Sequence, residues 1–575
     1  MLEDLRACKS LSSLAVLLEV KPSELSYILY KLPDSLKYNK FCISKKRGGT
    51  RNILAPCNRL KWIQSRLLDL LYLCEDDIAS ISGVTRNLHL GFRRDVNIFD
   101  NAKIHRKKRH VFNVDIANFF DQFNFGRVRG FFINDRNFVL DPAVATVIAQ
   151  ITCFENVLPQ GSPTSPHVAN LLTQFFDARM ARFLRPRRCA YSRYADDITI
   201  STNLKEFPAE VALSAPGDPQ GWLVSPELDA IFVRAGLPLN PAKTRMSSYT
   251  NRQVVTGLVV NQQPNVAREY YLATRSMCHH LFKTGQASAP EITQSFGNNC
   301  PDKAGELANE KPLKPSEILR VVEGRLSHIH NIRERSDQRS IQDKQDSPTQ
   351  FWTMLQDFYL YKYFFANNRA MILTEGPSDI FYIRSAILND TTVIAPNLKR
   401  FVGGNPEVIP AFFRFNTVAA RVIGLTGGSG NIKRFLYLYH KQGHKFTSAS
   451  KTYPVIIVID NDTGGSDVIS MVNGIYKTQI ALSDPTMVHK VTDGLLLVKT
   501  PHIGAKIHSC VEDMLPTSAR AVALNGKTFS SAKKFDTTKH FGKIALASHV
   551  QANAGSVNFS GFQSFVMAID AAVTA

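Results

Sequence analysis

The spacing of apolar residues changes along the chain, and the change predicts two kinds of folded segment. Up to about residue 265, short apolar strands alternate with helical patches of mixed polarity. From Met371 onward, unbroken runs of Val, Ile and Leu alternate with helix-like stretches, as in AMILTE, SDIFYIRSAI, VIIVIDND and LLLVK. Strands that are buried on both faces read as continuous apolar runs, so the second pattern predicts a parallel sheet covered by helices.

A polar stretch separates the two patterns. It reads as helices interrupted by small polar residues, and it ends in the charged run RERSDQRSIQDKQDSP, which is typical of a linker or an exposed helix. The chain has 575 residues and is 44% hydrophobic, so it can bury at least two cores. We therefore predict a multidomain α+β and α/β chain, with a first domain over 1–265, helices and a linker over 266–345, and an α/β domain over 346–575.

The composition favours a polyanionic partner. The chain has 69 Lys and Arg against 49 Asp and Glu, a formal net charge of +20, which suits nucleic acid, although a cationic membrane-surface protein would look similar by charge alone. No window approaches the roughly 20 consecutive apolar residues of a membrane span, so we expect no membrane partner. The nine cysteines are scattered without a CxxC pair, which indicates neither a disulfide framework nor a zinc ribbon and predicts a cytoplasmic location.

Three aspartates in the first half are placed for metal-dependent phosphate chemistry. The apolar run VFNVD ends on Asp115, and CAYSRYADDITIST predicts two strands joined by a turn that holds Asp196 and Asp197. A turn there would bring these acids beside Asp115. Two divalent metals need such a carboxylate cluster, because bound cations relieve the repulsion among the acids. Taken alone, an Asp-Asp pair in a hairpin is more typical of a solvated turn.

The second half carries another acidic set at predicted strand ends. Glu375 follows an apolar strand, and Gly376 permits a sharp turn before a helix that begins near Asp379. Asp460 and Asp462 follow the run VIIVI, with a spacing that sends both side chains to the same side of an extended chain. Because α/β sheets place their sites at the carboxyl ends of parallel strands, we predict a site there for one or two Mg²⁺ ions.

Two further segments are candidates for the same site. The glycine-rich stretch from Gly427 to Gly430 can approach a phosphate, although a tight turn explains it equally well and the GK[ST] of an NTPase loop is missing. Glu512 and Asp513 follow another candidate strand and would add carboxylates.

The order of motifs in the first half resembles the reverse transcriptases. VDIANFF, LPQGSPTSPHVANLL and YSRYADDITI look like the successive palm motifs of that family. The resemblance implies a right-hand-like polymerase with fingers and palm over 1–265 and a thumb within 266–345. It assigns catalysis and metal binding to Asp115, Asp196 and Asp197. It assigns the pocket for the incoming nucleotide to Gln160, Gly161 and Ser162.

One aromatic residue matches a specificity element of that family. Phe120, the second aromatic after Asp115, corresponds to the steric gate, a bulky ring that would collide with a ribose 2′-hydroxyl and favour dNTPs. The alternative for Phe119 and Phe120 is plain core packing, and we expect one of the two rings in the core.

Further strings resemble bacterial retron reverse transcriptases in particular. The NAxxH and VTG strings are present, and the resemblance implies RNA binding by Asn101, His105, Val255, Thr256 and Gly257. The segment KKRGGTRNILAPCNRLKWIQ resembles the retron fingers, with Arg51 as a triphosphate contact, and NPAKTRM would bring Lys243 towards the active site. In a basic polymerase we expect the strings Lys45–Arg47 and Arg106–Arg109 to contact phosphates, although such strings are usually solvated faces.

The second half resembles the Toprim domain of topoisomerases, primases and overcoming-lysogenization-defect-type nucleases. The ordered set of EGxxD, a glycine-rich segment and DxD carries this resemblance. It implies a Rossmann-like domain with a parallel sheet, with Glu375, Asp460 and Asp462 as catalytic residues and metal ligands and Asp379 as a further ligand. The alternative is a metal-free Toprim domain that only binds nucleic acid.

These resemblances imply a retron-type RNA-directed DNA polymerase fused to a Toprim nuclease that uses Mg²⁺. Such an enzyme would recognise a structured non-coding RNA encoded beside it, start from a guanosine 2′-hydroxyl, and build branched RNA–DNA (msDNA) from dNTPs in defence against phage. The rival interpretations are a group II intron-like reverse transcriptase and a non-catalytic nucleic-acid-binding scaffold. Whether the chain forms a homo-oligomer is left open.

Overall fold

The computed structural model describes residues 1–44, 50–82, 89–215, 221–286, 314–389, 395–449, 451–504, 508–530, 532 and 535–575. Contacts between residues divide it into two units. Of the described residues, the first unit holds 1–272 and 327–337, and the second holds 273–286, 314–326 and 338–575. Because the two units interleave within the segment from 266 to 345, the predicted domain boundaries stay predictions. The basic string Lys45–Arg47 lies outside the described residues.

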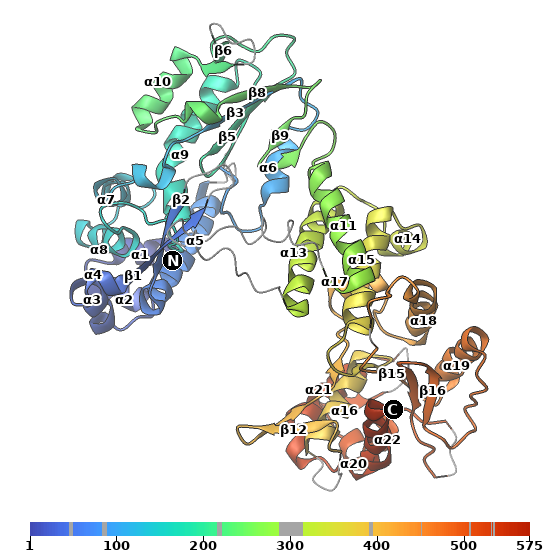
Figure 1. Cartoon of the computed structure of the whole chain (residues 1–575). Helices are drawn as coiled ribbons and strands as arrows, with labels where there is room; N and C mark the ends of the chain where they lie inside the picture. The colour runs from blue at the N-terminus through green and yellow to red at the C-terminus, as the bar shows by residue number, and fades with distance from the viewer. Residues whose placement is uncertain are drawn as a thin grey trace, which may run out of the picture. The chain divides into compact units, whose positions relative to one another are not determined.

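The first unit opens with short helices and a hairpin that pack on one long helix (Figure 1). The elements are α1 (Leu2–Ala7), α2 (Leu11–Leu17), α3 (Pro22–Tyr30), α4 (Asp34–Lys37), β1 (Tyr38–Ser44), β2 (Thr50–Pro56) and α5 (Asn58–Ser82). The apolar faces of the helices share one core, in which Leu14, Leu25, Ile63 and Leu67 are fully buried. The hairpin strands β1 and β2 pair antiparallel and stay partly exposed.

A four-stranded antiparallel sheet follows, in the order β4-β5-β3-β8. Its elements and their neighbours are α6 (Ile98–Ile104), β3 (His110–Asp115), η1 (Phe119–Gln122), α7 (Phe125–Asn134), α8 (Pro142–Thr152), α9 (Ser165–Leu184), β4 (Ala190–Tyr194), β5 (Asp197–Thr202), β6 (Ala212–Ser214), β7 (Trp222–Val224), α10 (Pro226–Ala235), η2 (Pro241–Lys243), β8 (Arg245–Ser248), β9 (Val254–Val255) and β10 (Leu258–Val259). Alternate side chains of β3 and β5, such as Phe112 and Ile200, share a core with Val168 and Phe176 of α9. The long helix α9 therefore backs the sheet and fixes where its strands end.

A fully buried ion pair joins α9 to this sheet. The Arg193 guanidinium on β4 donates to both carboxylate oxygens of Asp177 on α9, at 2.8 and 2.7 Å, and the Tyr191 hydroxyl donates to the same carboxylate at 2.6 Å. Burial alone would raise the pKa of Asp177, but the charge and hydrogen bonds of Arg193 outweigh burial and lower this pKa to about 2. The pair is thus charged on both sides and has good geometry, which a buried pair requires.

The second unit is a layered α/β structure. It comprises parts of α11 (Arg268–Thr284) and α13 (Pro315–Glu334), then α14 (Ile341–Asp346), α15 (Gln350–Leu360), the π-helix η5 (Tyr361–Phe365), β11 (Met371–Leu373), α16 (Pro377–Asn389), β12 (Lys399–Val402), β13 (Asn405–Val408), β14 (Ala411–Phe412), α17 (Val418–Ile423), α18 (Ser429–Gly443), β15 (Val455–Ile459), α19 (Thr463–Tyr476), β16 (Val488–Thr492), β17 (Leu495–Lys499), η6 (Val511–Met514), α20 (Thr517–Arg520), β18 (Thr528–Phe529), β19 (His540–Phe541), α21 (Lys543–Ala552), η7 (Ala554–Ser556), η8 (Ser560–Phe562) and α22 (Gln563–Thr574).

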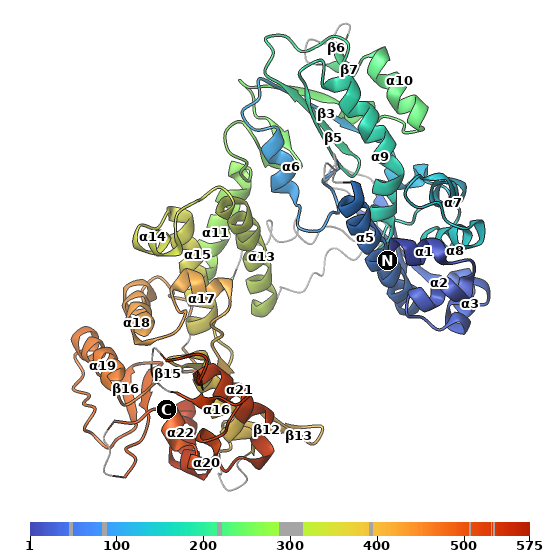
Figure 2. The same ribbon diagram turned by 180° about the vertical axis from the view of Figure 1, so that it is seen from behind.

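The sheet of the second unit has the strand order β14-β11-β15-β17-β16. Four strands run parallel, and β16 is antiparallel to β17 because the two are joined by a tight turn at Asp493-Gly494, where Gly494 has φ +75°. Ile456 and Val458 face a core formed with α16, α21 and α22 (Figure 2). Their neighbours in β15 are equally buried and, by the two-residue period of a strand, face the opposite side. Helices therefore cover both faces of the central strands.

No helix in the described part of the chain combines the length and the apolar character that crossing a bilayer requires.

The buried ion pair gives a stability prediction for the first unit. Asp177→Ala leaves the Arg193 charge buried and unpaired, so we expect the free energy of unfolding to fall by about 3–5 kcal/mol. Asp69 makes an exposed ion pair with Arg94, and Asp69→Ala should cost less than about 1 kcal/mol. Urea unfolding of both variants beside wild type checks this, and equal losses would show that the buried pair has no special weight.

Candidate active sites

The register of the sheet in the first unit brings the three expected aspartates to one edge. Asp115, the last residue of β3, lies opposite Asp197, the first residue of β5, and Tyr194 of β4 is paired with Asp197 on its other side. The N–H of Ile116 donates to the carbonyl of Asp196 at 3.0 Å. Asp115 therefore shares one end of the sheet with acids 81 and 82 positions further along the chain, as the predicted turn requires.

A left-handed residue shapes the turn that presents these acids. Ala195 has φ +57° and is buried, and its carbonyl accepts a hydrogen bond from Arg193 at 3.1 Å. Gly91 packs against the turn so closely that a Cβ on it would lie 2.7 Å from the Ala195 nitrogen. Asn170 donates to the carbonyl of Gly91 at 2.8 Å and fixes this contact. The buried ion pair and Gly91 together hold a backbone conformation that alanine rarely adopts.

The carboxylates at this edge repel one another. Burial, with the charge of Asp115, raises the pKa of Asp196, and burial raises the pKa of Asp197 to about 6 although Arg245 opposes it. Lys243 compensates part of this negative charge, because its ammonium lies 2.9 and 2.8 Å from the two carboxylate oxygens of Asp115. The N–H of Asn240 donates to the Asp115 carbonyl at 2.8 Å and brings the turn η2 into place.

The donor set suits a hard divalent cation. Carboxylate oxygens are the ligands that Mg²⁺ prefers, and a cation would relieve the repulsion that raises the two pKa values. Within the described residues, no group of three or more His, Cys, Asp or Glu side chains is already drawn together around a metal position. Because Lys243 engages both oxygens of Asp115, a cation there would have to displace this ammonium.

The residues expected around the incoming nucleotide lie in different surroundings. Phe119 is buried in the core, and Phe120 is half-buried beside it, with ring centroids 5.4 Å apart. Arg51 is exposed on β2, and its charge lowers the pKa of Asp196, which places it within electrostatic reach of the acids. One ring of the Phe pair is thus in the core, as expected, and the other packs against the core with part of its surface exposed.

The hairpin formed by β1 and β2 contacts the loop before α9 at Gln160 and Gly161. The N–H of Leu54 on β2 donates to the Gln160 carbonyl at 2.7 Å. Gly161 has φ +126°, and a Cβ on it would lie 2.7 Å from the Leu54 carbonyl oxygen, so only glycine fits. Ser162 is buried and shares a hydrogen bond of 3.0 Å with Thr164, so its side chain supports the loop.

Residues of the NAxxH and VTG strings lie in the interior of the first unit. This corrects the prediction that the side chains of Asn101, His105 and Val255 bind RNA. Asn101, His105 and Val255 are completely buried, so their side chains do not contact RNA. Ser192 donates to Asn101 at 2.6 Å and therefore accepts from His105 Nε2 at 2.8 Å, which leaves Nδ1 to accept from Ser201 at 2.7 Å. The sequence predicted RNA contact for these residues because it does not show that their side chains are buried against one another.

The VTG turn has a different character at its tip. Thr256 has φ +46°, and its hydroxyl donates to the carbonyl of Ile98 at 3.3 Å, which ties the turn between β9 and β10 to α6. Gly257 is exposed with φ +83°, and nothing lies within 4 Å of a Cβ built on it. A partner can therefore approach the backbone at Gly257.

The second unit assembles its own acidic cluster at strand ends. The N–H of Asp460, which follows β15, donates to the Glu375 carboxylate at 3.2 Å, and the Asp460 carboxylate accepts from the N–H of Val511 at 3.0 Å. Asp379 on α16 is buried and accepts from the N–H of Gly376 at 2.9 Å. The structure thus brings Glu375, Asp379 and Asp460 together, as the sequence predicted for this edge.

Glu512 and Asp513 were candidates for this site, and the structure places them differently. Glu512 is 2% exposed, and its carboxylate accepts a hydrogen bond from Lys543 at 3.1 Å. Asp513 instead accepts from the N–H of Cys510 at 3.0 Å and pairs with Arg520, so it caps a turn outside the cluster. Lys543 begins α21 and had no sequence signal, because no motif or spacing links it to the acids.

Crowding raises the proton affinity of these acids strongly. Burial and the charges of neighbouring acids raise the pKa of Glu375 to about 7, that of Asp379 to about 6 and that of Asp460 to about 9. Burial alone would lower the pKa of Lys543, but Glu512 and Asp460 raise it above its ordinary value. A buried carboxylate cluster with one lysine is unfavourable as it stands and favours a bound cation.

Asp462, the remaining predicted acid of the second unit, accepts a hydrogen bond from the backbone. Asp462 is the N-cap of α19, and its Oδ1 accepts from the N–H of Gly465 at 2.9 Å. Its second oxygen is left for other partners. A Cβ on Gly464 would lie 3.1 Å from Asp462 Oδ1 and 3.2 Å from Ser429 Oγ, so the glycine-rich segment lies beside this helix start.

The glycine-rich segment also contacts the acidic cluster. The N–H of Gly428 donates to the Glu375 carbonyl at 2.7 Å, and Gly427 and Gly428 have φ +112° and +93°. The stretch is therefore a tight turn against the strand end, and it leads directly into α18.

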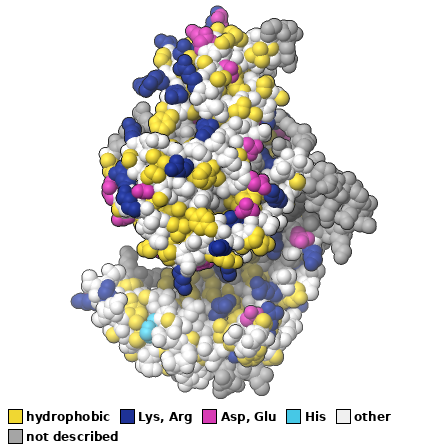
Figure 3. Space-filling model, turned by 90° about the vertical axis from the view of Figure 1, so that its left-hand side faces the viewer, with side chains coloured by type: hydrophobic (Ala, Val, Ile, Leu, Met, Phe, Trp, Pro, Cys, Tyr) yellow, Lys and Arg dark blue, Asp and Glu magenta, His cyan; other side chains and the backbone are white. Residues whose placement is uncertain are grey.

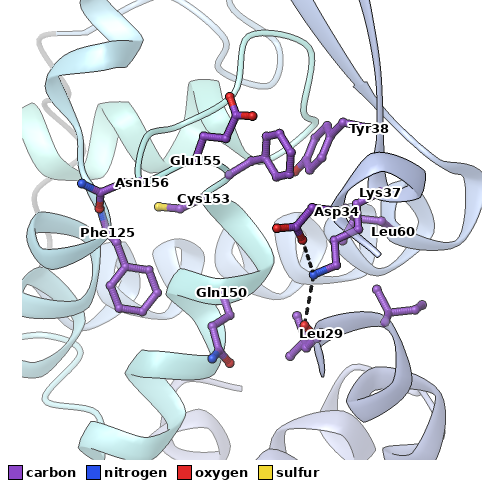
Figure 4. Close-up of a pocket in the computed structure, with 12 residues that line it drawn as sticks. Leu29, Asp34, Lys37, Tyr38, Leu60, Phe125, Gln150, Cys153, Glu155 and Asn156 are labelled. Atoms are coloured by element: carbon purple, nitrogen blue, oxygen red, sulfur yellow. Dashed lines mark hydrogen bonds and ion pairs between the residues drawn. The ribbon is translucent and has the colours of Figure 1, made fainter. Parts of the chain in front are cut away.

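A separate cavity lies between the first helices of the chain and the segment of α7, α8 and the residues after α8 (Figure 4). It has a volume of about 200 Å³ and is lined by Ile28, Leu29, Asp34, Lys37, Tyr38, Leu60, Phe125, Gln150, Cys153, Phe154, Glu155 and Asn156. Asp34 and Lys37 form an ion pair of 2.9 Å at one side of it. None of the residues expected at either site lines this cavity.

The buried histidine gives a pH prediction. Burial lowers the pKa of His105 to about 3, well below the 6.5 of an exposed histidine, so the folded chain holds it neutral and the unfolded chain protonates it first. Stability should be complete above pH 6.5 and fall as the pH drops towards 3, by up to about 1.4 kcal/mol per pH unit for this group. His105→Gln should flatten the slope of unfolding free energy against pH, and an unchanged slope would contradict this.

Known proteins match the first half of the chain. Residues 43–266 match the family model for reverse transcriptase (RNA-dependent DNA polymerase). The retron Ec86 reverse transcriptase of Escherichia coli is 28% identical over 267 residues, which are 45% of this chain and 74% of that protein. The retron Mx65 reverse transcriptase of Myxococcus xanthus is 29% identical over 309 residues, 50% of this chain and 64% of that protein.

Solved structures are more distant. Apo telomerase from Candida tropicalis has a TM-score of 0.31 and 12% sequence identity, over 57% of this chain and 63% of that chain. The assignment therefore depends on the family match and the sequence relatives, which confirm the predicted likeness to retron enzymes. Residues 43–266 are therefore similar to reverse transcriptases, and the relatives matched in sequence are retron enzymes.

Proposed function

We propose that this chain is a retron-type RNA-directed DNA polymerase joined to a Toprim nuclease. It makes branched RNA–DNA (msDNA) from a cognate structured non-coding RNA, and it acts in defence against phage. The observation that supports the polymerase most is the register of β3 and β5, which sets Asp115 opposite Asp197 inside a domain that matches reverse transcriptases.

Each residue at the palm edge has a task in nucleotide addition. Asp115, Asp196 and Asp197 would hold divalent metal, with Mg²⁺ as the natural candidate, which when bound activates the attacking hydroxyl and stabilises the transferring phosphoryl. Lys243 forms an ion pair with Asp115 and would balance part of the charge of the acids when no cation is bound. Arg51, exposed on the fingers hairpin, binds the triphosphate of the dNTP.

The fingers contact and the aromatic gate set substrate choice. Gln160 and Gly161 hold β2 against the palm by backbone contact, so the hairpin and its Arg51 are fixed relative to the acids. Phe120, which is half-buried, presents a ring edge that excludes a ribose 2′-hydroxyl.

Charge and an open turn support the RNA partner. The chain carries a net charge of +20, and the face drawn in Figure 3 shows Lys and Arg side chains distributed over it. Gly257 offers exposed backbone at the tip of the VTG turn, so we assign RNA contact to the Thr256-Gly257 backbone. Asn101, His105 and Val255 support this turn and the palm from inside.

The acidic cluster of the second unit supports metal-dependent phosphodiester cleavage. Glu375, Asp379 and Asp460 would hold the metal, with Asp462 beside them, and a bound Mg²⁺ would supply an activated water and stabilise the phosphoryl charge. Lys543 forms an ion pair with Glu512 and would add positive charge beside a scissile phosphate.

A metal-free binding domain is the second candidate for this unit. Lys543 already neutralises one acid, and the described residues contain no group of side chains drawn together around a metal position. The pKa values raised to about 7 and about 9 favour the cleavage proposal instead, because protonated acids at these strand ends give a binding domain no evident benefit.

The polymerase proposal predicts loss of cDNA synthesis without the palm acids. Asp196→Asn with Asp197→Asn should lower RNA-templated dNTP incorporation by more than about 100-fold, because the metal-binding charge is gone. Asp121→Asn, an exposed aspartate nearby in sequence, is the matched control and should retain activity. Primer extension on an RNA template measures both, and full activity in the double variant would refute the proposal.

The gate proposal predicts a change in sugar selection. Phe120→Ala opens space for the 2′-hydroxyl, so discrimination between dNTP and rNTP should fall by about tenfold or more. Phe175→Ala removes an exposed ring from α9 and should leave discrimination unchanged. The ratio of kcat/KM values for dNTP and rNTP is the readout, and equal ratios in wild type and Phe120→Ala would exclude Phe120 as the gate.

The second site predicts a metal-dependent nuclease. Glu375→Gln removes a central carboxylate and should abolish Mg²⁺-dependent cleavage of DNA or RNA by the purified chain and protection of cells against phage. Glu407→Gln alters an exposed glutamate paired with Arg400 and should change neither. Cleavage retained in Glu375→Gln would exclude this cluster as its source and favour the metal-free binding domain.

A further inference from the structure

A loop of the second unit completes the end of α11. The last carbonyls of a helix have no partner within the helix and need donors from elsewhere. Ser448, which follows α18, donates from its hydroxyl to the carbonyls of Leu281 and Phe282 at 2.9 and 3.0 Å, and its N–H donates to Phe282 at 3.2 Å. Thr447 donates to the carbonyl of Lys283 at 3.2 Å. Two adjacent residues thereby supply donors to three consecutive carbonyls of the helix. The Leu281 carbonyl also accepts from the N–H of Gly285 at 2.9 Å, so the carbonyls of Phe282 and Lys283 are the ones that depend on the loop.

Aromatic packing surrounds this cap. The ring centroid of Phe282 lies 5.3 Å from that of Tyr361 and 5.1 Å from that of Phe446, and Phe365 lies 4.7 Å from Phe446. All four rings are buried. The Tyr361 hydroxyl shares a hydrogen bond of 3.0 Å with Ser448, so the cap and the aromatic cluster are one contact.

The neighbouring helix α13 also makes contacts within the second unit. Arg325 on α13 donates to the hydroxyl of Thr274 on α11 at 3.0 Å. Glu323, also on α13, pairs at 2.6 Å with Lys362, which lies in the π-helix between Tyr361 and Phe365. These parts of both helices therefore belong to the second unit.

We propose that the loop Phe446–Ser448 is a positioning element of the polymerase, through which the second unit sets how much DNA is made in one binding event. The proposal depends on the assignment of α11 and α13 to the thumb that follows the RNA–DNA duplex, which belongs to the proposed function. A thumb helix whose end is capped is held in one orientation. Without the cap, its last turn loosens and the grip on the duplex weakens.

The chemistry of the cap defines the variants. Ser448→Ala removes the hydroxyl bonds and keeps the backbone N–H, and Ser448→Thr restores a hydroxyl. The loss of bonds worth about 1 kcal/mol shifts a docked-to-undocked ratio by about fivefold. Ser470→Ala, an exposed serine on α19, is the matched control.

The experiment is primer extension by the full chain on a long RNA template, with a heparin trap that limits each enzyme to one binding event. Ser448→Ala should shorten the mean product by about fivefold, with the rate of a single dNTP addition unchanged, and Ser448→Thr should restore the length. Hydrogen exchange at the amides of residues 281–286 should quicken in Ser448→Ala alone.

Three outcomes would overturn the inference. If Ser448→Ala makes products as long as those of Ser470→Ala, and wild type extends normally, the role of the cap is refuted. The proposed polymerase activity would not be affected by that result. A parallel loss of single-nucleotide addition would show that Ser448 only supports folding. No extension by wild type would refute the proposed polymerase and the inference with it.

Discussion

Repulsion among buried carboxylates is the constraint on which both units depend. Each unit gathers acids at the ends of buried strands, where burial and proximity raise their pKa values, and each unit places one lysine against an acid of the set. Lys243 contacts Asp115 in the first unit, and Lys543 contacts Glu512 in the second. Buried acids with raised pKa values are candidates for cation and phosphate binding, and this is the basis on which we propose both clusters as sites.

A buried ion pair and close backbone contacts fix the positions of these acids. In the first unit, the buried Arg193–Asp177 pair and the close approach of Gly91 hold the left-handed Ala195. In the second unit, a Cβ on Gly465 would lie 2.0 Å from the Asp460 carbonyl oxygen, so only glycine permits α19 to start where it does. The two sites thus use different folds for the same purpose, which is to force acids into one place before any ligand arrives.

The sequence predicted the parts of this arrangement that depend on local pattern. An apolar run that ends on an acid located Asp115, Glu375 and Asp460 at strand ends, because strand burial and chain direction suffice for that inference. It did not find Arg193 or Lys543, whose partners are set by tertiary packing. It also took Asn101 and His105 as contact residues, since a polar string carries no sign of whether it faces solvent or another polar string. The apolar runs predicted a parallel sheet, but β16 runs antiparallel to β17. The apolar pattern did not reveal this because the direction of β16 is set by the Asp493-Gly494 turn that joins the two strands.

Divalent-metal binding by the purified chain tests the account most directly. Mn²⁺ binding, followed by electron paramagnetic resonance, should show sites in wild type that fall into two separable sets. The double substitution Asp196→Asn and Asp197→Asn should remove one set, and Glu375→Gln with Asp460→Asn should remove the other. Binding that both double variants leave unchanged, or that either one abolishes completely, would contradict the view that each unit holds its own carboxylate site.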